Sequence, residues 1–337
     1  MNLLMFLSDR CNMACDYCFL ALNTRPATIL SEDDGARAVD AHLARFGRGA
    51  RFTLLGGEPL LHPQLAAALA RRAGASGAKV SLVTNGTKAA PEIIGEFMEC
   101  GAEISVSLDG RAASHDAHRR ALGGGPTHGG VLKVLAKLDL RRLRANLVIS
   151  EDTVADFLAN IEWLRRRGFA RLSFHADAAR PWTRQGLSSL SAALAGFSRY
   201  ARLLQSGASS PWQLDSYLRA RTEPPAVDEE LVLGADGRYY AGDAWLSRPY
   251  GAGLDGAVGG LRDGVDWEKR GAILAGIDRA VARALDGAPY YTWPRETWTL
   301  AELAGRDASA DVRAFCEADA LLGGALSALG RERETAR

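Results

Sequence analysis

Three cysteines lie within eight residues near the start of the chain, namely Cys11, Cys15 and Cys18. The chain holds five cysteines, and neither this odd total nor the tight C-x3-C-x2-C spacing is typical of a disulfide framework. A structural zinc site takes four ligands, yet no fourth cysteine or histidine is close, the next histidine being His42. A four-iron cluster usually takes four thiolates as well. The cluster of cysteines therefore predicts metal or redox chemistry, and three thiolates on a four-iron cluster would leave one iron open.

Further polar motifs follow the next three expected strands. Gly56-Gly57-Glu58-Pro59 comes after the first of these, Thr84-Asn85-Gly86-Thr87 after the second, and Ser107-Leu108-Asp109-Gly110 after the third. Glycines let a backbone approach a ligand closely, and a carboxylate can accept a charge-assisted hydrogen bond from an ammonium group. Each motif alone is compatible with an ordinary turn, but their order along successive strand ends favours one shared site.

The cysteines and these motifs resemble those of the radical SAM superfamily. The resemblance, which covers about half of the chain, implies one [4Fe–4S] cluster held by the three cysteines, with S-adenosylmethionine (SAM) on the open iron. It places Glu58 at the SAM ammonium, Arg119 at its carboxylate with Arg120 as a competitor, and Tyr17 near adenine. The full set of cofactor-binding residues that the resemblance implies is Tyr17, Gly56, Gly57, Glu58, Pro59, Thr84, Asn85, Ser107, Asp109 and Arg119.

Within that superfamily, the segment from Ser107 through His115-Asp116-x-x-Arg119 resembles the SPASM/twitch branch, which includes sulfatase maturases and other peptide-modifying enzymes. The stretch from Asp236 to Asp243 is similar to a hairpin of that branch, but Gly242 stands where the branch has a cysteine. Cys100 and Cys316 are expected to be buried small hydrophobic residues. The sequence therefore predicts no auxiliary cluster.

The resemblance implies an enzyme in which the reduced cluster cleaves SAM to a 5′-deoxyadenosyl radical, which abstracts hydrogen from the substrate. A ribosomally synthesised peptide is the expected substrate, modified by a cross-link, an epimerisation or a thioether. A small molecule such as a sugar, nucleotide or amino acid is the alternative, and a non-catalytic iron–sulfur sensor or electron carrier is another. The expected partners are an external one-electron reductant of the flavodoxin or ferredoxin type and a separate leader-binding protein, because Cys11 lies so near the start.

Candidates for a catalytic hydrogen donor or base are His175, Asp243 and Tyr240, and the sequence does not choose among them. His115, His118 and His128 lie in or near a glycine-rich stretch and are expected to be solvated.

The elements that must position these residues alternate between strands and helices. Six strand–helix units precede residue 205, and most chemically interesting residues follow a strand, as in α/β barrels whose sites lie at the C-terminal strand ends. The pattern predicts an α/β fold with an incomplete (β/α)6 barrel of parallel strands, although an open doubly wound sheet alternates in the same way. We expect a radical SAM partial barrel over 1–205 and a smaller, degenerate SPASM/twitch-like α+β domain over 206–337.

The composition argues against a nucleic-acid-binding protein and a membrane protein. The 337 residues include 41 basic and 40 acidic side chains, so the formal charge of +1 gives no basic excess for binding nucleic acid. No apolar run reaches the ~18–20 residues of a membrane span, and the first residues do not read as a signal peptide. A cytoplasmic protein without nucleic-acid or membrane partners is expected.

Overall fold

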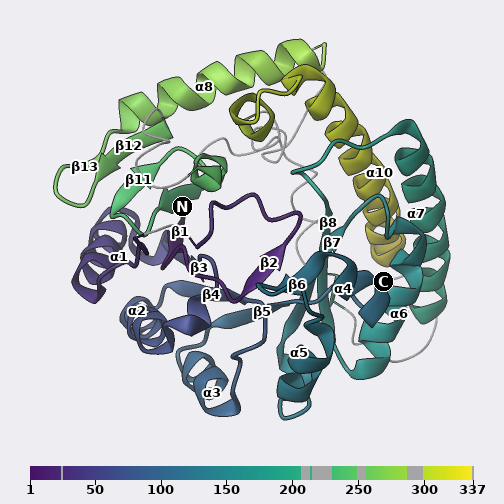
Figure 1. The fold of residues 1–337 in the computed structure, drawn as a ribbon, viewed down its shortest axis with the longest axis horizontal. Coiled ribbons are helices and arrows are strands. Elements are labelled where there is room, and N and C mark those ends of the chain that lie inside the picture. Colours follow the sequence, from purple (N-terminus) through teal and green to yellow (C-terminus); the bar gives the residue numbers. More distant parts are fainter. Residues whose placement is uncertain (24–25, 206–212, 215–229, 249–255, 287–298, 336–337) are drawn as a thin grey trace. The chain divides into compact units, whose positions relative to one another are not determined.

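The computed structural model describes residues 1–23, 26–205, 213–214, 230–248, 256–286 and 299–335 (Figure 1). The chain divides into two compact units. The first unit comprises Met1–Ser107, Arg119–Leu138 and Val227–Arg279, and the second comprises Leu108–His118, Asp139–Ala226 and Ala280–Arg337. Each unit is thus assembled from segments that are far apart in the sequence.

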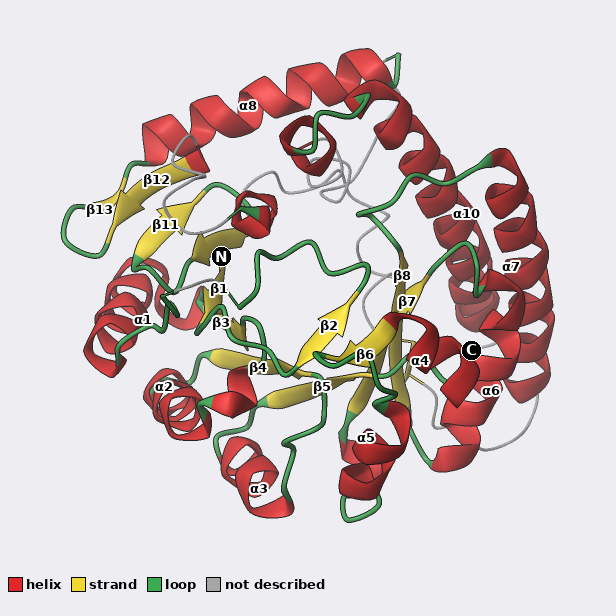
Figure 2. Cartoon of the chain, in the orientation of Figure 1, coloured by secondary structure: helices red, strands yellow, loops and turns green. Residues whose placement is uncertain are grey.

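The first unit is built on parallel strands joined by helices. Its central strands are neighbours in the order β1 (Asn2–Phe6), β3 (Arg51–Leu55), β4 (Lys79–Thr84) and β5 (Glu103–Ser107). The connecting helices α1 (Glu32–Phe46), α2 (Pro63–Ala75) and α3 (Pro91–Glu99) line one side of these strands (Figure 2). Ser31 caps α1 by accepting a hydrogen bond from the Asp34 backbone NH. The expected alternation of strand and helix is confirmed here.

The other edge of this sheet is formed by residues from the C-terminal half of the chain. Strand β10 (Glu230–Leu233) pairs in parallel with β1, and β11 (Arg238–Tyr240), β12 (Ala257–Gly260) and β13 (Gly264–Val265) follow in antiparallel order. The expected hairpin is therefore the β10–β11 pair. A short 3-10 helix, η5 (Asp243–Ser247), comes next, and α8 (Trp267–Ala284) follows β13.

A two-stranded antiparallel ribbon carries part of the cysteine motif. Strand β2 (Met13–Cys15) pairs with β6 (Arg119–Ala121), and Cys15 lies opposite Arg119. Met13–Cys15 is therefore extended, whereas Cys11 and Cys18 lie outside the ribbon. The short elements η1 (Gly47–Gly49), η2 (Pro59–Leu61) and α5 (His128–Leu135) complete the unit.

The second unit repeats the parallel arrangement. Its strands lie in the order β7 (Arg144–Ile149), β8 (Arg171–Ala176) and β9 (Gln213–Leu214). Its helical elements are α4 (Ala112–His118), η3 (Leu140–Arg142), η4 (Val154–Asp156), α6 (Phe157–Arg167), α7 (Arg184–Gln205) and α10 (Ala308–Thr335). The rings of Phe157, Phe174 and Phe197 pack 5.1–5.6 Å apart and join α6, β8 and α7 in one core.

The expected domain boundary between residues 205 and 206 falls at the edge of the described part, because 206–212 lie outside it. That boundary stays a prediction. Among the described residues, no helix has the length and apolar character that a membrane crossing requires.

Candidate functional site

The cysteine motif is held by the ribbon and by the loops on either side of it. Cys11 precedes β2 and is 7% exposed, Cys15 ends β2, and Cys18 follows a turn in which its backbone NH donates to the Cys15 carbonyl at 3.1 Å. None of the three forms a disulfide. The structure thus gathers the three cysteines on one short, backbone-restrained segment of the first unit.

Cys11 is the most constrained of the three thiols. Its sulfur accepts a hydrogen bond from the Met13 backbone NH at 3.3 Å, and its own NH donates to Oδ1 of Asn23 at 3.2 Å. The pKa of Cys11 is raised to about 12, chiefly by burial and to a smaller extent by the negative charges of Glu58, Cys15 and Cys18, while the Met13 hydrogen bond opposes the rise. Burial also raises the pKa of Cys18.

This donor set fits a cationic iron–sulfur cluster. Thiolates that are buried and close enough to repel one another require a cation to stay deprotonated, and three sulfur ligands leave one position of a four-iron cluster open. Among the described residues, no three His, Cys, Asp or Glu side chains are gathered at metal-ligating distances. The three thiols therefore have to converge when a cluster binds.

The glycines of the second motif make room for the chain that carries Cys11. A Cβ added to Gly57 would lie 2.1 Å from the Arg10 carbonyl oxygen and 3.0 Å from the Cys11 nitrogen. The Gly57 NH donates to Ser8 and the Glu58 NH to Arg10, both backbone to backbone at 2.9 and 2.8 Å. In the structure the close approach is to the cysteine-bearing backbone, which explains the need for glycine at this position.

Glu58 is buried beneath this contact and is 1% exposed. Its Oε1 accepts hydrogen bonds from the Leu60 NH at 3.0 Å and the Thr84 hydroxyl at 2.7 Å, and its Oε2 accepts one from the Asn85 NH at 2.7 Å. Burial raises the pKa of Glu58 to about 6, while these three donors oppose the rise. Glu58 therefore links the end of β3 to the end of β4 and is positioned by both, with Pro59 starting η2 directly after it.

The residues after β4 turn back toward the cysteines. The side-chain amide of Asn85 donates to Oδ1 of Asn12 at 2.9 Å and contacts the Cys11 sulfur at 3.8 Å. Asn12 in turn donates to the Thr87 hydroxyl at 2.8 Å, and that hydroxyl donates to Oδ1 of Asn85 at 2.6 Å. Asn12 was not among the residues that the sequence analysis singled out, although a short polar side chain directly after a ligand cysteine is a signal for such a role.

Arg119 and Tyr17 lie together beside the cysteines. Arg119 is 6% exposed, and its guanidinium carbon lies 5.2 Å from the centroid of the Tyr17 ring. The Arg119 charge also lowers the pKa of Cys18 against the larger effect of burial. Arg120, by contrast, is exposed and follows Arg119 on β6, so the two successive side chains point to opposite faces of the ribbon.

The third motif is divided between the two units. Ser107 ends β5 in the first unit and is half-buried. Asp109 belongs to the second unit and is 4% exposed, and its Oδ1 accepts a hydrogen bond from the Val148 backbone NH of β7 at 3.0 Å. The structure thus gives the Asp109 carboxylate a backbone partner within its own unit.

Two of the candidate hydrogen donors lie in the first unit. Tyr240 is 1% exposed and its hydroxyl donates to Asp236 at 2.8 Å, so it closes the β10–β11 hairpin. Asp243 begins η5 and is half-buried. The Leu246 carbonyl of η5 accepts a hydrogen bond from the Ala21 NH at 2.8 Å, which places η5 against the loop that follows Cys18.

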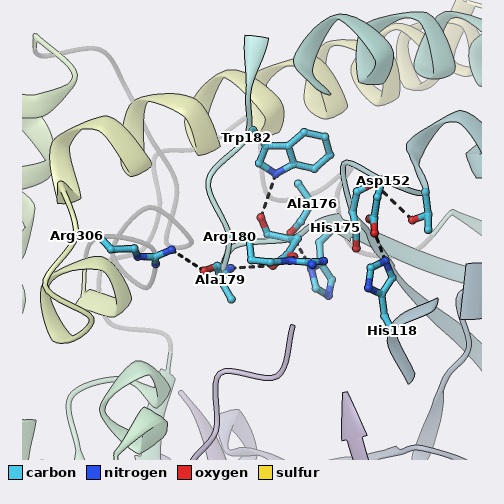
Figure 3. Close-up of polar contacts among 11 residues, drawn as sticks. His118, Asp152, His175, Ala176, Ala179, Arg180, Trp182 and Arg306 are labelled. Carbon is cyan, nitrogen blue, oxygen red and sulfur yellow. Dashed lines mark hydrogen bonds and ion pairs between the residues drawn. The ribbon is translucent and has the colours of Figure 1, made fainter. Parts of the chain in front are cut away.

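His175, the third candidate, lies on β8 in the second unit. Phe174 and Ala176 are buried against the helices, so His175 points to the opposite face of the strand, and its Nδ1 lies 3.1 Å from the Ala176 carbonyl oxygen (Figure 3). The loop after β8 is fixed by polar contacts in which Arg306 donates to the Ala179 carbonyl at 3.0 Å and Trp182 donates to the Asp177 carbonyl at 3.1 Å.

The expectation that three histidines are solvated is wrong. His115, His118 and His128 are 0%, 2% and 7% exposed. Nδ1 of His115 accepts a hydrogen bond from the Asp109 NH at 3.5 Å, and Nε2 of His118 lies 3.0 Å from Asp152 (Figure 3). The segment reads as polar in sequence, but α4 and the start of α5 turn these imidazoles inward.

Comparison with known proteins gives a consistent family. The family described as Radical SAM superfamily matches residues 5–176, just over half of the chain. Among curated relatives, AdoMet-dependent heme synthase of Methanosarcina barkeri is 31% identical over 48% of this chain and 46% of its own length. Serine-type anaerobic sulfatase-maturating enzyme of Klebsiella aerogenes is 30% identical over 42% of this chain and 38% of its own length. GTP 3′,8-cyclase of Synechococcus is 34% identical over 48% of this chain and 50% of its own length. The chain spans half or less of the length of these relatives.

Solved structures share the fold over a larger part of the chain. The structure of histidine-tagged anSMEcpe with bound AdoMet matches with a TM-score of 0.65 and 18% identity, covering 80% of this chain and 79% of that one. Streptococcus suis SuiB bound to the precursor peptide SuiA matches with a TM-score of 0.57 and 14% identity, covering 81% and 66%. These likenesses confirm the expected fold class, α/β with an incomplete barrel of parallel strands.

Proposed function

The chain belongs to the Radical SAM superfamily, and we propose that within this superfamily of enzymes it modifies a ribosomally synthesised peptide. The enzyme class and the cofactors, one [4Fe–4S] cluster and SAM, are those of the superfamily. One observation carries the choice of substrate: the fold is shared over 80% of the chain with anSMEcpe, which has been solved with AdoMet and the Cp18Cys peptide. The sulfatase-maturating relatives support the same choice.

In this proposal Cys11, Cys15 and Cys18 hold the cluster. Their supporting features are the shared short segment, the burial of Cys11 and the restraint of its sulfur by the Met13 NH. When bound, the cluster and SAM supply the one-electron chemistry that removes a hydrogen atom from the substrate. The chain itself restrains the Cys11 sulfur, shields it from water and supplies charged partners for SAM.

The SAM contacts that we propose come from the strand ends of the first unit. Glu58 binds the SAM ammonium, Arg119 binds the carboxylate, and Tyr17 lies at adenine. The burial of Glu58 and Arg119 supports these roles, because a desolvated carboxylate and guanidinium interact strongly with an oppositely charged ligand. Gly56, Gly57 and Pro59 hold Glu58 in place, and Thr84, Asn85 and Ser107 complete the set.

Asp109 is proposed to act at a distance from SAM, because its carboxylate is bound to the β7 backbone. Of the candidate hydrogen donors, Asp243 is the one supported by its position, since η5 lies against the cysteine loop. Tyr240 is buried with its hydroxyl on Asp236, which favours a structural role. His175 remains a candidate on the face of β8 opposite to Phe174 and Ala176.

We further propose that a flavodoxin- or ferredoxin-type reductant supplies the electron, and that a separate protein presents the peptide leader. These partners follow from the chemistry of a reducible cluster and from the peptide substrate.

Deuterium transfer identifies the substrate class. The reconstituted full chain is incubated with SAM, a chemical reductant and extract from cells grown in D2O, divided by ultrafiltration into fractions above 3 kDa and below 1 kDa. The proposal predicts deuterated 5′-deoxyadenosine from the large fraction, and loss of the label after protease treatment of that fraction. Label that arises only from the small fraction and survives protease would contradict a peptide substrate.

The second candidate function is action on a small molecule. The similarity to GTP 3′,8-cyclase and to AdoMet-dependent heme synthase favours it, because both names indicate small-molecule products. The small fraction of the same experiment, together with deuterated GTP as a defined probe, distinguishes this candidate from the peptide.

A further inference from the structure

Three side chains beside the cysteine motif form a closed ring of hydrogen bonds. Asn85 donates to Asn12, Asn12 donates to Thr87, and Thr87 donates back to Asn85, at 2.9, 2.8 and 2.6 Å. The Thr87 backbone NH also donates to Oδ1 of Asn85 at 3.0 Å. Each amide oxygen therefore faces a donor and each amide nitrogen that takes part faces an acceptor, which fixes the orientation of both amide groups.

The ring directs one amide group at a cluster cysteine. The Nδ2 atom of Asn85 that donates to Asn12 also lies 3.8 Å from the Cys11 sulfur. Asn85 is 8% exposed and Cys11 is 7% exposed, so this contact is shielded from water. In such a low-dielectric setting an oriented N–H dipole acts strongly on a sulfur whose charge changes.

The turn that carries the ring is held by the buried carboxylate of Glu58. The Asn85 backbone NH donates to Glu58, and the Thr84 hydroxyl donates to the same carboxylate. Gly86 allows the tight turn with φ +79°, and a Cβ there would lie 2.8 Å from Val106. The turn that carries Asn85 and Thr87 therefore has little freedom to move away from Cys11.

We propose that Asn12 and Thr87 are positioning residues that hold the Asn85 amide on the Cys11 sulfur and thereby set the reduction potential of the cluster. The proposal rests on the proposed cluster at Cys11. Hydrogen bonds to cluster sulfurs stabilise the reduced, more negative state and raise the potential. Removing the ring leaves the Asn85 side chain held only at its Oδ1 by the Thr87 backbone NH. Its Nδ2 then loses the Asn12 partner that keeps it on the Cys11 sulfur, so the cluster becomes harder to reduce.

The test compares Asn12→Ala, Thr87→Val and the double variant with the wild-type full chain. Each protein is reconstituted without oxygen, and the signal of the reduced cluster is followed by electron paramagnetic resonance in a redox titration without SAM. We expect the ratio of reduced to oxidised cluster at a fixed potential to fall about tenfold in Asn12→Ala and by the same factor in Thr87→Val, which corresponds to a potential lower by about 59 mV for a one-electron couple. The double variant should match Asn12→Ala, because the ring acts as one unit.

Thr53→Val is the matched control. Thr53 lies on β3 and its hydroxyl donates to Oδ1 of Asn2 at 3.2 Å, so the substitution removes a threonine–asparagine hydrogen bond in the same unit but away from the cysteines. Its potential should equal that of the wild type. Equal potentials in all loaded variants would overturn this inference and leave the proposed function intact. Failure of the wild-type chain to bind a cluster would overturn both.

Discussion

The carboxyl group of Glu58 is buried, and its pKa is raised above the ordinary value for a carboxyl group. Burial raises its pKa to about 6, and donors from Leu60, Thr84 and Asn85 limit the rise. A protonated carboxyl cannot attract an ammonium, whereas the carboxylate can. The affinity for SAM should therefore increase as the pH rises through 6 and become constant above that value.

Replacing Glu58 by Gln keeps the shape and removes the charge. We expect SAM affinity at pH 7.5 to fall by ~1–3 kcal/mol, or about 5- to 150-fold, because a ligand ammonium is left without its charged partner. Anaerobic equilibrium dialysis of the cluster-loaded protein between pH 5.5 and 7.5 measures both effects, and the variant should show a flat profile. A pH dependence that persists in Glu58→Gln would assign it to another group.

At the scale of elements, the contact between the Gly57 turn and the cysteine loop is as tight as backbones allow. Gly57→Ala places a methyl group 2.1 Å from the Arg10 carbonyl oxygen, which forces the cysteine loop to shift. We expect a loss of stability of about 1–3 kcal/mol and a lower iron content after reconstitution. Denaturant unfolding and iron analysis check the two parts.

Gly95→Ala serves as the control for that substitution. Gly95 lies within α3, and an added Cβ there has no neighbour within 4 Å. Alanine should stabilise this helix by about 0.5–1 kcal/mol and leave the iron content unchanged. Equal iron content in Gly57→Ala and Gly95→Ala would mean that the glycine contact does not position the cysteines.

The packing of α1 on β3 depends on a neutral histidine. His42 is 5% exposed, lies between Phe46 and Phe52, and its Nε2 is 3.2 Å from the Met1 carbonyl oxygen. Burial lowers the pKa of His42 to about 4. The unfolded chain protonates His42 near pH 6.5, whereas the folded chain protonates it only near pH 4. The contribution of neutral His42 to the free energy of unfolding is therefore present above pH 6.5 and is lost as the pH falls toward 4.

That lost stability amounts to about 3 kcal/mol. Chemical denaturation of the cluster-free chain between pH 4.5 and 7.5 measures it, and His42→Leu should show a smaller loss over the same range. An identical pH dependence in both proteins would show that carboxyl groups, and not His42, account for the acid sensitivity.

The sequence predicts a helix or strand correctly where a local pattern of residues is enough to specify it. The strands Arg51–Leu55 and Arg144–Ile149 belong to the expected strand–helix units, because their alternating apolar residues and flanking turns specify them without help from distant residues. The ribbon of β2 and β6 was missed because its strands are three residues long and pair across more than a hundred residues. The Asn12–Thr87 contact was missed for the same reason, since it joins distant residues and no local pattern predicts which loop a short polar side chain reaches.

At the scale of the molecule, both compact units combine segments from the N- and C-terminal halves. In the first unit, β10 pairs with β1 from Asn2↔Glu230 to Met5↔Leu233. A chain truncated after residue 205 loses this strand and leaves the backbone groups of β1 unpaired at a sheet edge. We expect the truncated chain to aggregate or unfold when purified, as measured by light scattering and circular dichroism. A folded monomer would instead favour the predicted boundary between residues 205 and 206.

The central claim is that three cysteines of this chain hold a cluster that cleaves SAM. The most direct measurement is mass spectrometry of 5′-deoxyadenosine after anaerobic reconstitution and addition of SAM and a strong reductant, with Cys15→Ala and Cys100→Ala beside the wild type. Cys100 is a free cysteine outside the motif, so it controls for the loss of a thiol. The account predicts 5′-deoxyadenosine from the wild type and Cys100→Ala and none from Cys15→Ala. Equal product from all three proteins would contradict the account.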